Sequence, residues 1–423
     1  LSSSAQPHHI AEITTLGTDG SRYIYGIAAY NNTQKEITFS VGSTNIDNHS
    51  NSSGWTDEAT KGIVPYGPSD NSLSNSQGLD NYYSRTTTPG YAHSYLLTSV
   101  LTPDYIDADG IRGPSDGDFG GYTKFEYQKT SNFKWRTPVA TSNNIATFSE
   151  GLKSDYTDDK ANIIYGEKDL YYLDKVTTKN YVAVFHKSPR QDGKGVSGED
   201  GAVSSSQTIL RLDSISLYSK RDLTTPLKRV HFEYTYALCQ GAPNSSSGKL
   251  TLKKIYFTYQ NSNRARMSPY VFDYHETNPA ENPNYNIKAY DRWGNYKPNN
   301  LTTTIGVKSA SDANSFIGTT NLAPSDYPYV EQDKLLTDVY TAVWNLKEIN
   351  LPSGGTIKMS YESDEYAYVQ NKQAGQMFKI INYVPTAVGS DNGNSLKNFA
   401  TGGGKFVFKL HNGITDINKY ISG

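Results

Sequence analysis

A short strand pattern, in which apolar and aromatic residues alternate with polar ones and end on Tyr, recurs along this 423-residue chain. In Arg229–Tyr236 apolar and aromatic side chains take every second position, the period of a strand that buries one face. Further copies occupy Gly121–Tyr127, Lys254–Tyr259, Pro269–Tyr274 and Gly355–Tyr361. A single copy is typical of any amphipathic strand, but five copies predict that the chain folds mainly into a β-sheet.

The composition favours the same fold class. The chain holds 34 Tyr and 14 Phe against 3 Met, and 35 Gly with 18 Pro provide many turns. Its length allows two or three domains or one elongated β structure. We therefore expect a mainly β protein, an extended antiparallel sheet with a few short helices.

One segment is typical of a linker. Residues 188–207 are rich in Gly and Ser and contain almost no apolar side chain to bury. We predict a flexible linker or loop there. It would separate a β-rich region with long polar loops, residues 1–187, from a second strand region, residues 208–423.

Three segments predict short helices. Leu335, Leu336, Val339 and further apolar residues at spacings of three and four indicate an amphipathic helix over 331–346, although a strand over 342–351 competes with it. The other two candidates are a helix after Pro89 within 80–101 and a helix within 364–378.

Charge and targeting signals exclude several classes. With 40 basic and 42 acidic residues the net charge is −2, which gives no electrostatic reason to expect nucleic acid or an anionic membrane as a partner. No apolar run approaches the roughly 18 residues of a transmembrane helix. The first residues, Leu1–Pro7, lack Met and a basic region, so we expect a segment of a longer polypeptide.

The sharpest candidate site is the Gly-rich loop Asp104–Asp118, which holds five carboxylates. Calcium takes six to eight oxygen ligands, and alternating Asp residues in a flexible loop supply them. Asp107, Asp109 and Asp116 match positions three, five and twelve of a calcium loop, whereas Tyr105 stands at the first. The predicted calcium ligands are Asp107, Asp109, Asp116 and Asp118. The alternative is a solvated turn whose Asp side chains cap local backbone amides.

Motifs for catalysis are missing from the sequence. The histidines lie in no zinc-ligand spacing, the chain has no G-x-S-x-G motif, and Gly402–Lys405 lacks the spacing of a phosphate-binding loop. The single cysteine, Cys239, excludes an internal disulfide, and we expect a buried structural thiol there. We predict no catalytic residue, no organic cofactor and no enzymatic activity.

Two motifs resemble a known family. Tyr290–Asn295 resembles the Tyr-Asp-x-x-Gly-Asn core of RHS/YD repeats, and Leu351–Gly355 followed by Tyr361 is similar to hairpins found in those proteins. The chain as a whole is similar to the large RHS-like surface proteins of Bacteroidota. In the motif, Tyr290 would pack while Asp291 and Asn295 set the turn around Gly294.

The resemblance implies a non-enzymatic role. Residues 208–423 would be an RHS/YD-like strand region of a secreted or cell-surface bacterial protein, part of a β shell or scaffold. The expected partner is the remainder of the same polypeptide or an enclosed cargo. A surface adhesin or glycan-binding module, with tyrosines and tryptophans stacking on sugars, is the first alternative. A β-rich glycosidase with two converging carboxylates is the second.

Overall fold

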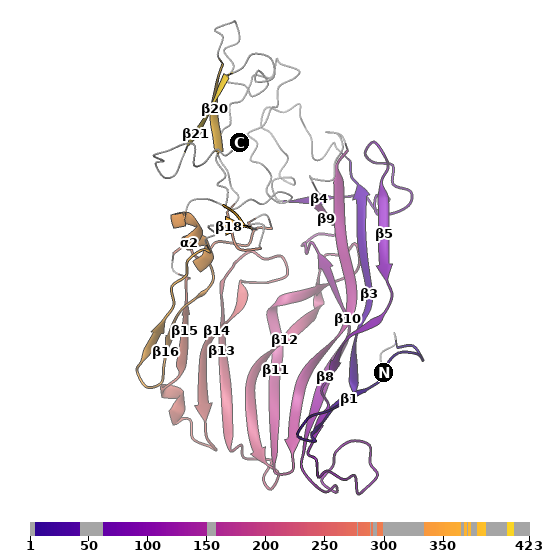
Figure 1. Cartoon of the computed structure of the whole chain (residues 1–423), viewed down its shortest axis with the longest axis vertical. Helices are drawn as coiled ribbons and strands as arrows, with labels where there is room; N and C mark the ends of the chain where they lie inside the picture. Colours follow the sequence, from indigo (N-terminus) through magenta and orange to yellow (C-terminus); the bar gives the residue numbers. More distant parts are fainter. Residues whose placement is uncertain are drawn as a thin grey trace. The chain divides into compact units, whose positions relative to one another are not determined.

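The computed structural model describes residues 5–42, 62–149, 158–276, 278–287, 289–290, 294–298, 334–364, 368–369, 371–373, 379–385 and 404–409. The chain divides into two compact units. Unit 1 comprises Leu1–Lys288 and Trp344–Met359, and unit 2 comprises Ala289–Val343 and Ser360–Gly423. The predicted mainly β fold is confirmed, because strands dominate the described residues of unit 1 (Figure 1).

The strands of unit 1 form one antiparallel sheet. They are β1 (Ile13–Leu16), β2 (Arg22–Tyr25), β3 (Ile27–Ser40), β4 (Ile63–Pro65), β5 (Tyr83–Thr88), β6 (Tyr91–Leu96), β7 (Ser99–Leu101), β8 (Tyr122–Thr137), β9 (Ile145–Phe148), β10 (Lys160–Thr178), β11 (Tyr181–Val196), β12 (Val203–Ser219), β13 (Lys228–Leu238), β14 (Lys249–Thr258), β15 (Tyr270–Tyr274), β16 (Leu346–Asn350) and β17 (Thr356–Lys358). A 3-10 helix, Arg264–Met267, lies between β14 and β15.

Unit 2 contains the helix α2 (Lys334–Ala342) and two small hairpins. The hairpins are β18 (Tyr368–Val369) with β19 (Lys372–Gln373), and β20 (Lys379–Pro385) with β21 (Gly404–Lys409). Within the described residues, no helix has the length and hydropathy that a membrane-spanning helix needs.

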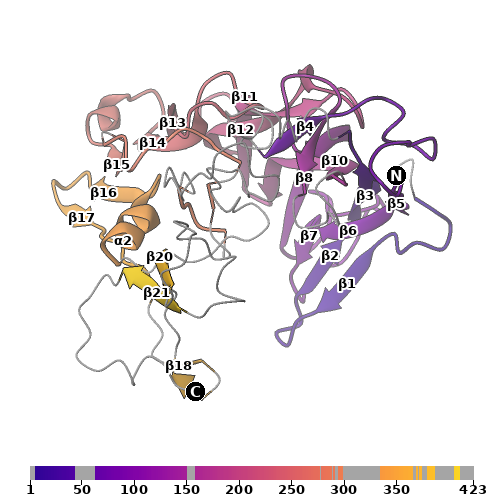
Figure 2. The same ribbon diagram turned by 90° about the horizontal axis from the view of Figure 1, so that it is seen from above.

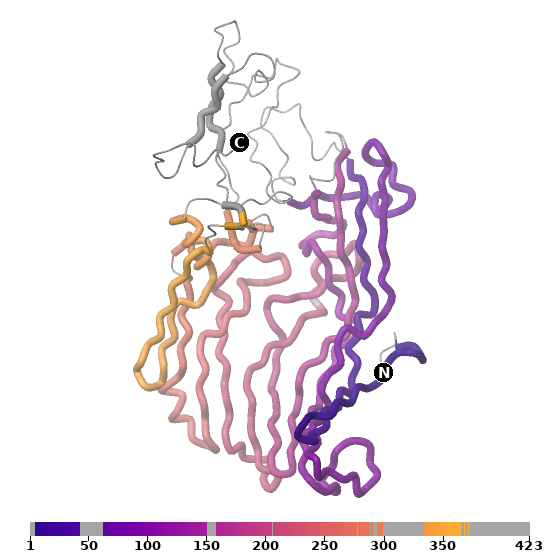
Figure 3. The backbone as a smooth tube through the Cα atoms, viewed as in Figure 1, coloured from indigo at the N-terminus to yellow at the C-terminus, as the bar shows by residue number. Residues whose placement is uncertain are grey.

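The long strand β10 joins the two parts of the unit 1 sheet. β8 runs along one side of β10 for most of its length. On the other side, the first half of β10 pairs with β3, and Lys175–Thr177 near its end pair with β11. The path of the chain through this junction can be followed in Figure 3. β10 therefore connects the N-terminal strands to the strands that follow it.

The fully buried core lies at the first half of β10. Alternate residues of β3, namely Ile37 and Phe39, pack there with Ala161 and Ile163 of β10. The whole cluster is Ile37, Phe39, Val41, Val64, Tyr66, Ala146, Phe148, Ala161, Ile163, Tyr165 and Val196.

From β10 to β17 each strand pairs antiparallel with the next one along the chain. We call these strands the meander. Figure 2 shows them following one another along a curve. In β13 every residue except the last is half-buried. Neither face of this strand is therefore buried as completely as the residues of a hydrophobic core.

The cross-strand register gives the meander two chemically different faces. Phe125 pairs with Val176, and Val230 pairs with both Ile215 and Phe257. The apolar face consists of Phe125, Val176, Ala183, Phe185, Ile215, Leu217, Val230, Phe232, Ile255, Phe257, Tyr270, Phe272, Ile349 and Ile357. None of these residues is fully buried.

The opposite face is mostly polar. The polar face consists of Glu126, Lys175, Val184, His186, Ser214, Ser216, Arg229, His231, Glu233, Lys254, Tyr256 and Thr258. Its charges form cross-strand ion pairs such as Lys175–Glu126 at 3.6 Å and Lys254–Glu233 at 3.8 Å. The alternation seen in the sequence is thus a division between two faces of one sheet layer.

Four of the five Tyr-ended copies lie in β8, β13, β14 and β15, as predicted. In the fifth, only Thr356–Lys358 forms a strand.

The segment 188–207 differs from a linker, because it forms the paired ends of β11 and β12 and the turn between them. Polar contacts replace apolar burial there: the carboxylate of Asp192 is buried against the guanidinium of Arg190 at 2.6 Å.

Two of the predicted helices are wrong. The segment 80–101 forms β5, β6 and β7, because β5 and β6 complete the edge of β3. The described residues within 364–378 contain β18 and β19. The helix predicted over 331–346 is confirmed in its middle as α2, and the competing strand is confirmed as β16, so the two share the segment.

Candidate metal centre

The Asp-rich segment is the loop between β7 and β8, residues 102–121. Its two ends are joined by hydrogen bonds between Thr102 and Gly121, including one of 2.7 Å from the Gly121 amide to the Thr102 hydroxyl. An isolated bridge between Ile106 and Phe119 continues this pairing. Gly120 has φ +75°, and a Cβ there would lie 2.5 Å from the carbonyl oxygen of Asp104. The loop closes this tightly because residue 120 is glycine.

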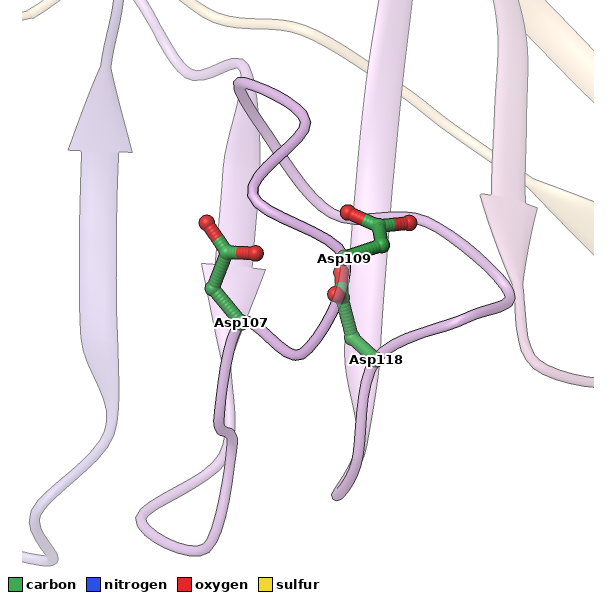
Figure 4. A group of neighbouring side chains, drawn as sticks. All are labelled: Asp107, Asp109 and Asp118. Carbon is green, nitrogen blue, oxygen red and sulfur yellow. The ribbon is translucent and has the colours of Figure 1, made fainter.

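Three of the four predicted calcium ligands come together in this loop. Carboxylate oxygens of Asp107, Asp109 and Asp118 all lie within 4.8 Å of one another. Figure 4 shows the three side chains on neighbouring stretches of the loop. Asp107 and Asp109 are exposed, whereas Asp118 is buried. We call these three residues the Asp triad.

The backbone of the loop folds around these carboxylates. Asp118 accepts hydrogen bonds from the Tyr105 hydroxyl and the Ser115 amide, both at 2.7 Å, and from the Ala108 amide at 3.1 Å. Asp107 accepts a bond of 2.7 Å from the Gly110 amide. The Tyr105 hydroxyl, followed by the Ser115 and Ala108 amides, lowers the pKa of Asp118. The carboxylate of Asp118 is therefore held in its charged form.

Asp116 lies apart from the triad. Its carboxylate pairs with the ammonium group of Lys220 and accepts the Tyr122 hydroxyl at 2.5 Å. The bond to Lys220, followed by that to Tyr122, lowers the pKa of Asp116. Asp116 thus ties the loop to the end of β12, while Asp118 takes the position beside Asp107 and Asp109.

Within the described residues no cation pairs with a carboxylate of the triad, although the Lys179 ammonium group donates a hydrogen bond to the backbone carbonyl of Asp118. In the part of the chain that the structure describes, no ion pair within 4 Å involves Asp107, Asp109 or Asp118, although Asp116 has one. The loop amides leave lone pairs free on the three carboxylates, since each carboxylate has about four acceptor positions. An all-oxygen cluster of this spacing fits a hard cation such as Ca²⁺.

The second sequence-predicted motif lies in unit 2 and is partly described. Tyr290 and Tyr296 form an isolated antiparallel bridge, and Gly294 between them has φ +84°. These observations agree with a turn around Gly294 and Asn295. Asp291 lies outside the described residues.

The only cysteine has the environment of a structural thiol. Cys239 follows β13, and its thiol is buried. Burial raises the pKa of this thiol, so the reactive thiolate is disfavoured.

The fold and the loop together describe a mainly β chain with a single-layer meander and an acidic loop at one end of it. Comparison with protein-family models, with curated proteins and with solved structures found no match for this chain.

Proposed function

We propose that this chain is a non-enzymatic structural segment of a large secreted or cell-surface bacterial protein, and that its meander is part of the wall of an RHS-like β shell. The observation that carries the proposal is the arrangement of β10 to β17. These strands lie side by side in sequence order as one layer, with an apolar face that is only half-buried.

A single layer suits a wall because the strands satisfy each other's backbone groups without a second sheet. A compact domain of this size would bury its aromatic side chains, since burial contributes roughly 25 cal/mol per Å² of apolar surface. Here Phe232, Phe257 and Phe272 stay partly exposed on the apolar face. Contiguous apolar surface on a soluble chain marks a place where something else packs. We assign that contact to the remainder of the same polypeptide or to an enclosed cargo.

Adjacent residues on opposite faces test this assignment. Ser214 lies on the polar face and Ile215 on the apolar face, and both are half-buried. We expect Ser214→Cys and Ile215→Cys to react with a maleimide in the isolated chain. In the complete polypeptide, only the position on the polar face should remain reactive. The parent chain, whose only thiol is buried, gives the baseline.

We propose further that the Asp triad holds Ca²⁺ and thereby fixes the loop between β7 and β8. The support is the spacing of the three carboxylates and the lack of a cationic partner for them among the described residues. A bound ion removes the repulsion between like charges, and it stabilises the folded state by mass action.

The melting temperature of the chain should therefore rise by several degrees in Ca²⁺ and fall again with chelator. Calcium at about 100 times its Kd would stabilise the fold by about 2.7 kcal/mol. Asp107→Asn and Asp109→Asn should abolish this difference. Asp116→Asn is the control, because Asp116 lies outside the triad, and its melting temperature should still depend on Ca²⁺. Equal melting temperatures of the parent chain in Ca²⁺ and in chelator would contradict the calcium proposal.

A further inference from the structure

Basic and titratable side chains gather on the polar face of the meander, away from the Asp triad. His186 of β11 pairs with Ser214 of β12, which pairs with His231 of β13. In the neighbouring row, Ser216 of β12 pairs with Arg229 of β13. We call His186, Arg229 and His231 the Arg229 cluster.

A buried hydroxyl fixes the guanidinium of this cluster. Ser216 is completely buried, and its hydroxyl oxygen accepts a hydrogen bond of 2.7 Å from Nε of Arg229. The same hydroxyl lies 3.0 Å from Nε2 of His186. Nε is engaged by Ser216, and among the described residues the two Nη groups of Arg229 form no hydrogen bond. Arginine presents its donors as a rigid planar fork, so holding one side orients the other.

The second histidine is also held in place. Nε2 of His231 lies 3.0 Å from the hydroxyl of Thr258, and its ring stacks on that of Tyr256 with a centroid distance of 4.6 Å and an interplanar angle of 7°. The three side chains of the cluster are thus positioned by contacts within the sheet before any ligand arrives.

No carboxylate compensates the charge of Arg229. Among the described residues, no ion pair within 4 Å involves it. Asp174 and Asp213 act on His186, but each is already paired, with Lys187 and Arg211 respectively, at 2.9 Å. On the polar face, Glu233 lies four residues further along β13, about 13 Å away, and Glu126 lies four strands away, about 19 Å. Glu233 is already paired with Lys254 and Arg266 at 3.8 Å. Glu126 is paired with Lys175. The cluster is therefore locally positive although the chain is close to neutral.

We propose that the Arg229 cluster is a binding site for an oxyanion, namely a sulfate, phosphate or carboxylate group of an anionic ligand. The Nη groups of Arg229 would donate two parallel hydrogen bonds to the anion. The imidazoles on either side would contribute further donors when protonated. The site lies on the face opposite the apolar one, so this proposal does not depend on the shell wall.

The histidines give the site a defined pH dependence. Burial lowers the pKa of His186, and the charges of Arg229 and Lys187 lower it further against the raising effect of Asp174 and Asp213. Burial and then Arg229 lower the pKa of His231, with Glu233 acting in the opposite direction and Arg266 in the same one. The neutral form of both rings is therefore favoured without ligand. A bound anion favours their charged forms, so affinity should increase as the pH falls through their pKa values.

Histidine side-chain NMR tests the site with inorganic sulfate, inorganic phosphate and acetate, each against chloride at the same ionic strength. We expect at least one of the three anions to raise the pKa values of His186 and His231 by about half a unit or more. The resonances of exposed His93, on β6, should follow only ionic strength. A larger pKa shift with sulfate or phosphate would indicate a ligand that carries one of these groups. A larger shift with acetate would indicate a carboxylate ligand.

Matched variants identify the anion-binding group. Arg229→Gln should abolish the shift, whereas Arg221→Gln, which removes the same charge at an exposed position in the turn between β12 and β13, should preserve it. Ser216→Ala keeps the charge and frees the guanidinium, so it should weaken the shift. The proposal is overturned if His186 and His231 move no more than His93, or if the shift survives Arg229→Gln.

Discussion

Replacing Arg136 with Met is expected to lower the free energy of unfolding by about 3–5 kcal/mol, because this substitution leaves several buried or half-buried acceptors unsatisfied. The Arg136 side chain is only 2% exposed. Its guanidinium donates hydrogen bonds to the carbonyl oxygens of Glu199 at 2.6 Å, Pro138 at 2.9 Å and Ile145 at 2.5 Å. One charged side chain thereby holds the end of β8, the turn between β11 and β12, and β9 together.

Chemical denaturation monitored by circular dichroism measures this loss. Arg136→Lys keeps the charge but not the planar fork of donors, so it should recover only part of the stability. Arg112→Met is the control, because Arg112 is 91% exposed and forms one ion pair at 3.5 Å with Glu12. It should change the free energy of unfolding by less than about 1 kcal/mol. Equal effects of Arg136→Met and Arg112→Met would refute the role given to the buried guanidinium.

The second large effect is expected at Gly248, where alanine should destabilise the chain by about 3 kcal/mol. Gly248 precedes β14, and its amide donates a hydrogen bond of 3.0 Å to the carbonyl of Tyr236 in β13. A Cβ at residue 248 would lie 2.1 Å from the carbonyl oxygen of Leu238 and 2.3 Å from that of Tyr236. Both obstacles are backbone atoms, so the hairpin of β13 and β14 would have to open locally.

Gly198→Ala is the matched control. Gly198 lies in the turn between β11 and β12, and a Cβ there would meet no atom within 4 Å. Its alanine variant should unfold at about the same denaturant concentration as the parent chain. Equal stabilities of Gly248→Ala and Gly198→Ala would contradict the close approach of β13 and β14 at residue 248.

The strands were predictable because alternation is a local property of the sequence. Phe257 and Phe272 both stand two residues before the final Tyr of their copies of the pattern, and the structure places both on the apolar face. The junction at β10 was not predictable. Nothing local in its sequence indicates that β3 pairs with its first half and β11 with residues near its end.

Segment 188–207 shows why low hydrophobicity alone misleads. The Glu199 side chain pairs with Lys35 at 2.5 Å and Arg85 at 3.2 Å, while Asp192 is buried against Arg190. Lys35 and Arg85, far from Glu199 in the sequence, thus fix the turn between β11 and β12, and a local ion pair replaces apolar burial in β11.

The candidate sites also differ in how far the local sequence could predict them. Asp107, Asp109 and Asp118 lie within one loop, so their sequence pattern could indicate a cluster. The position of Asp116 depends on Lys220, which is distant in the sequence. The histidines of the Arg229 cluster look scattered along the chain, and only the register of β11, β12 and β13 brings them together.

The most direct measurement of the wall proposal is the ratio of maleimide labelling rates in the complete polypeptide and in the isolated chain, taken for Ser214→Cys and Ile215→Cys. Each variant is compared with itself, so intrinsic thiol reactivity cancels. A covered apolar face predicts that the rate for Ile215→Cys falls about tenfold or more in the complete polypeptide, while that for Ser214→Cys is unchanged. Unchanged rates for both variants would contradict a wall whose apolar side faces the remainder of the polypeptide or its cargo.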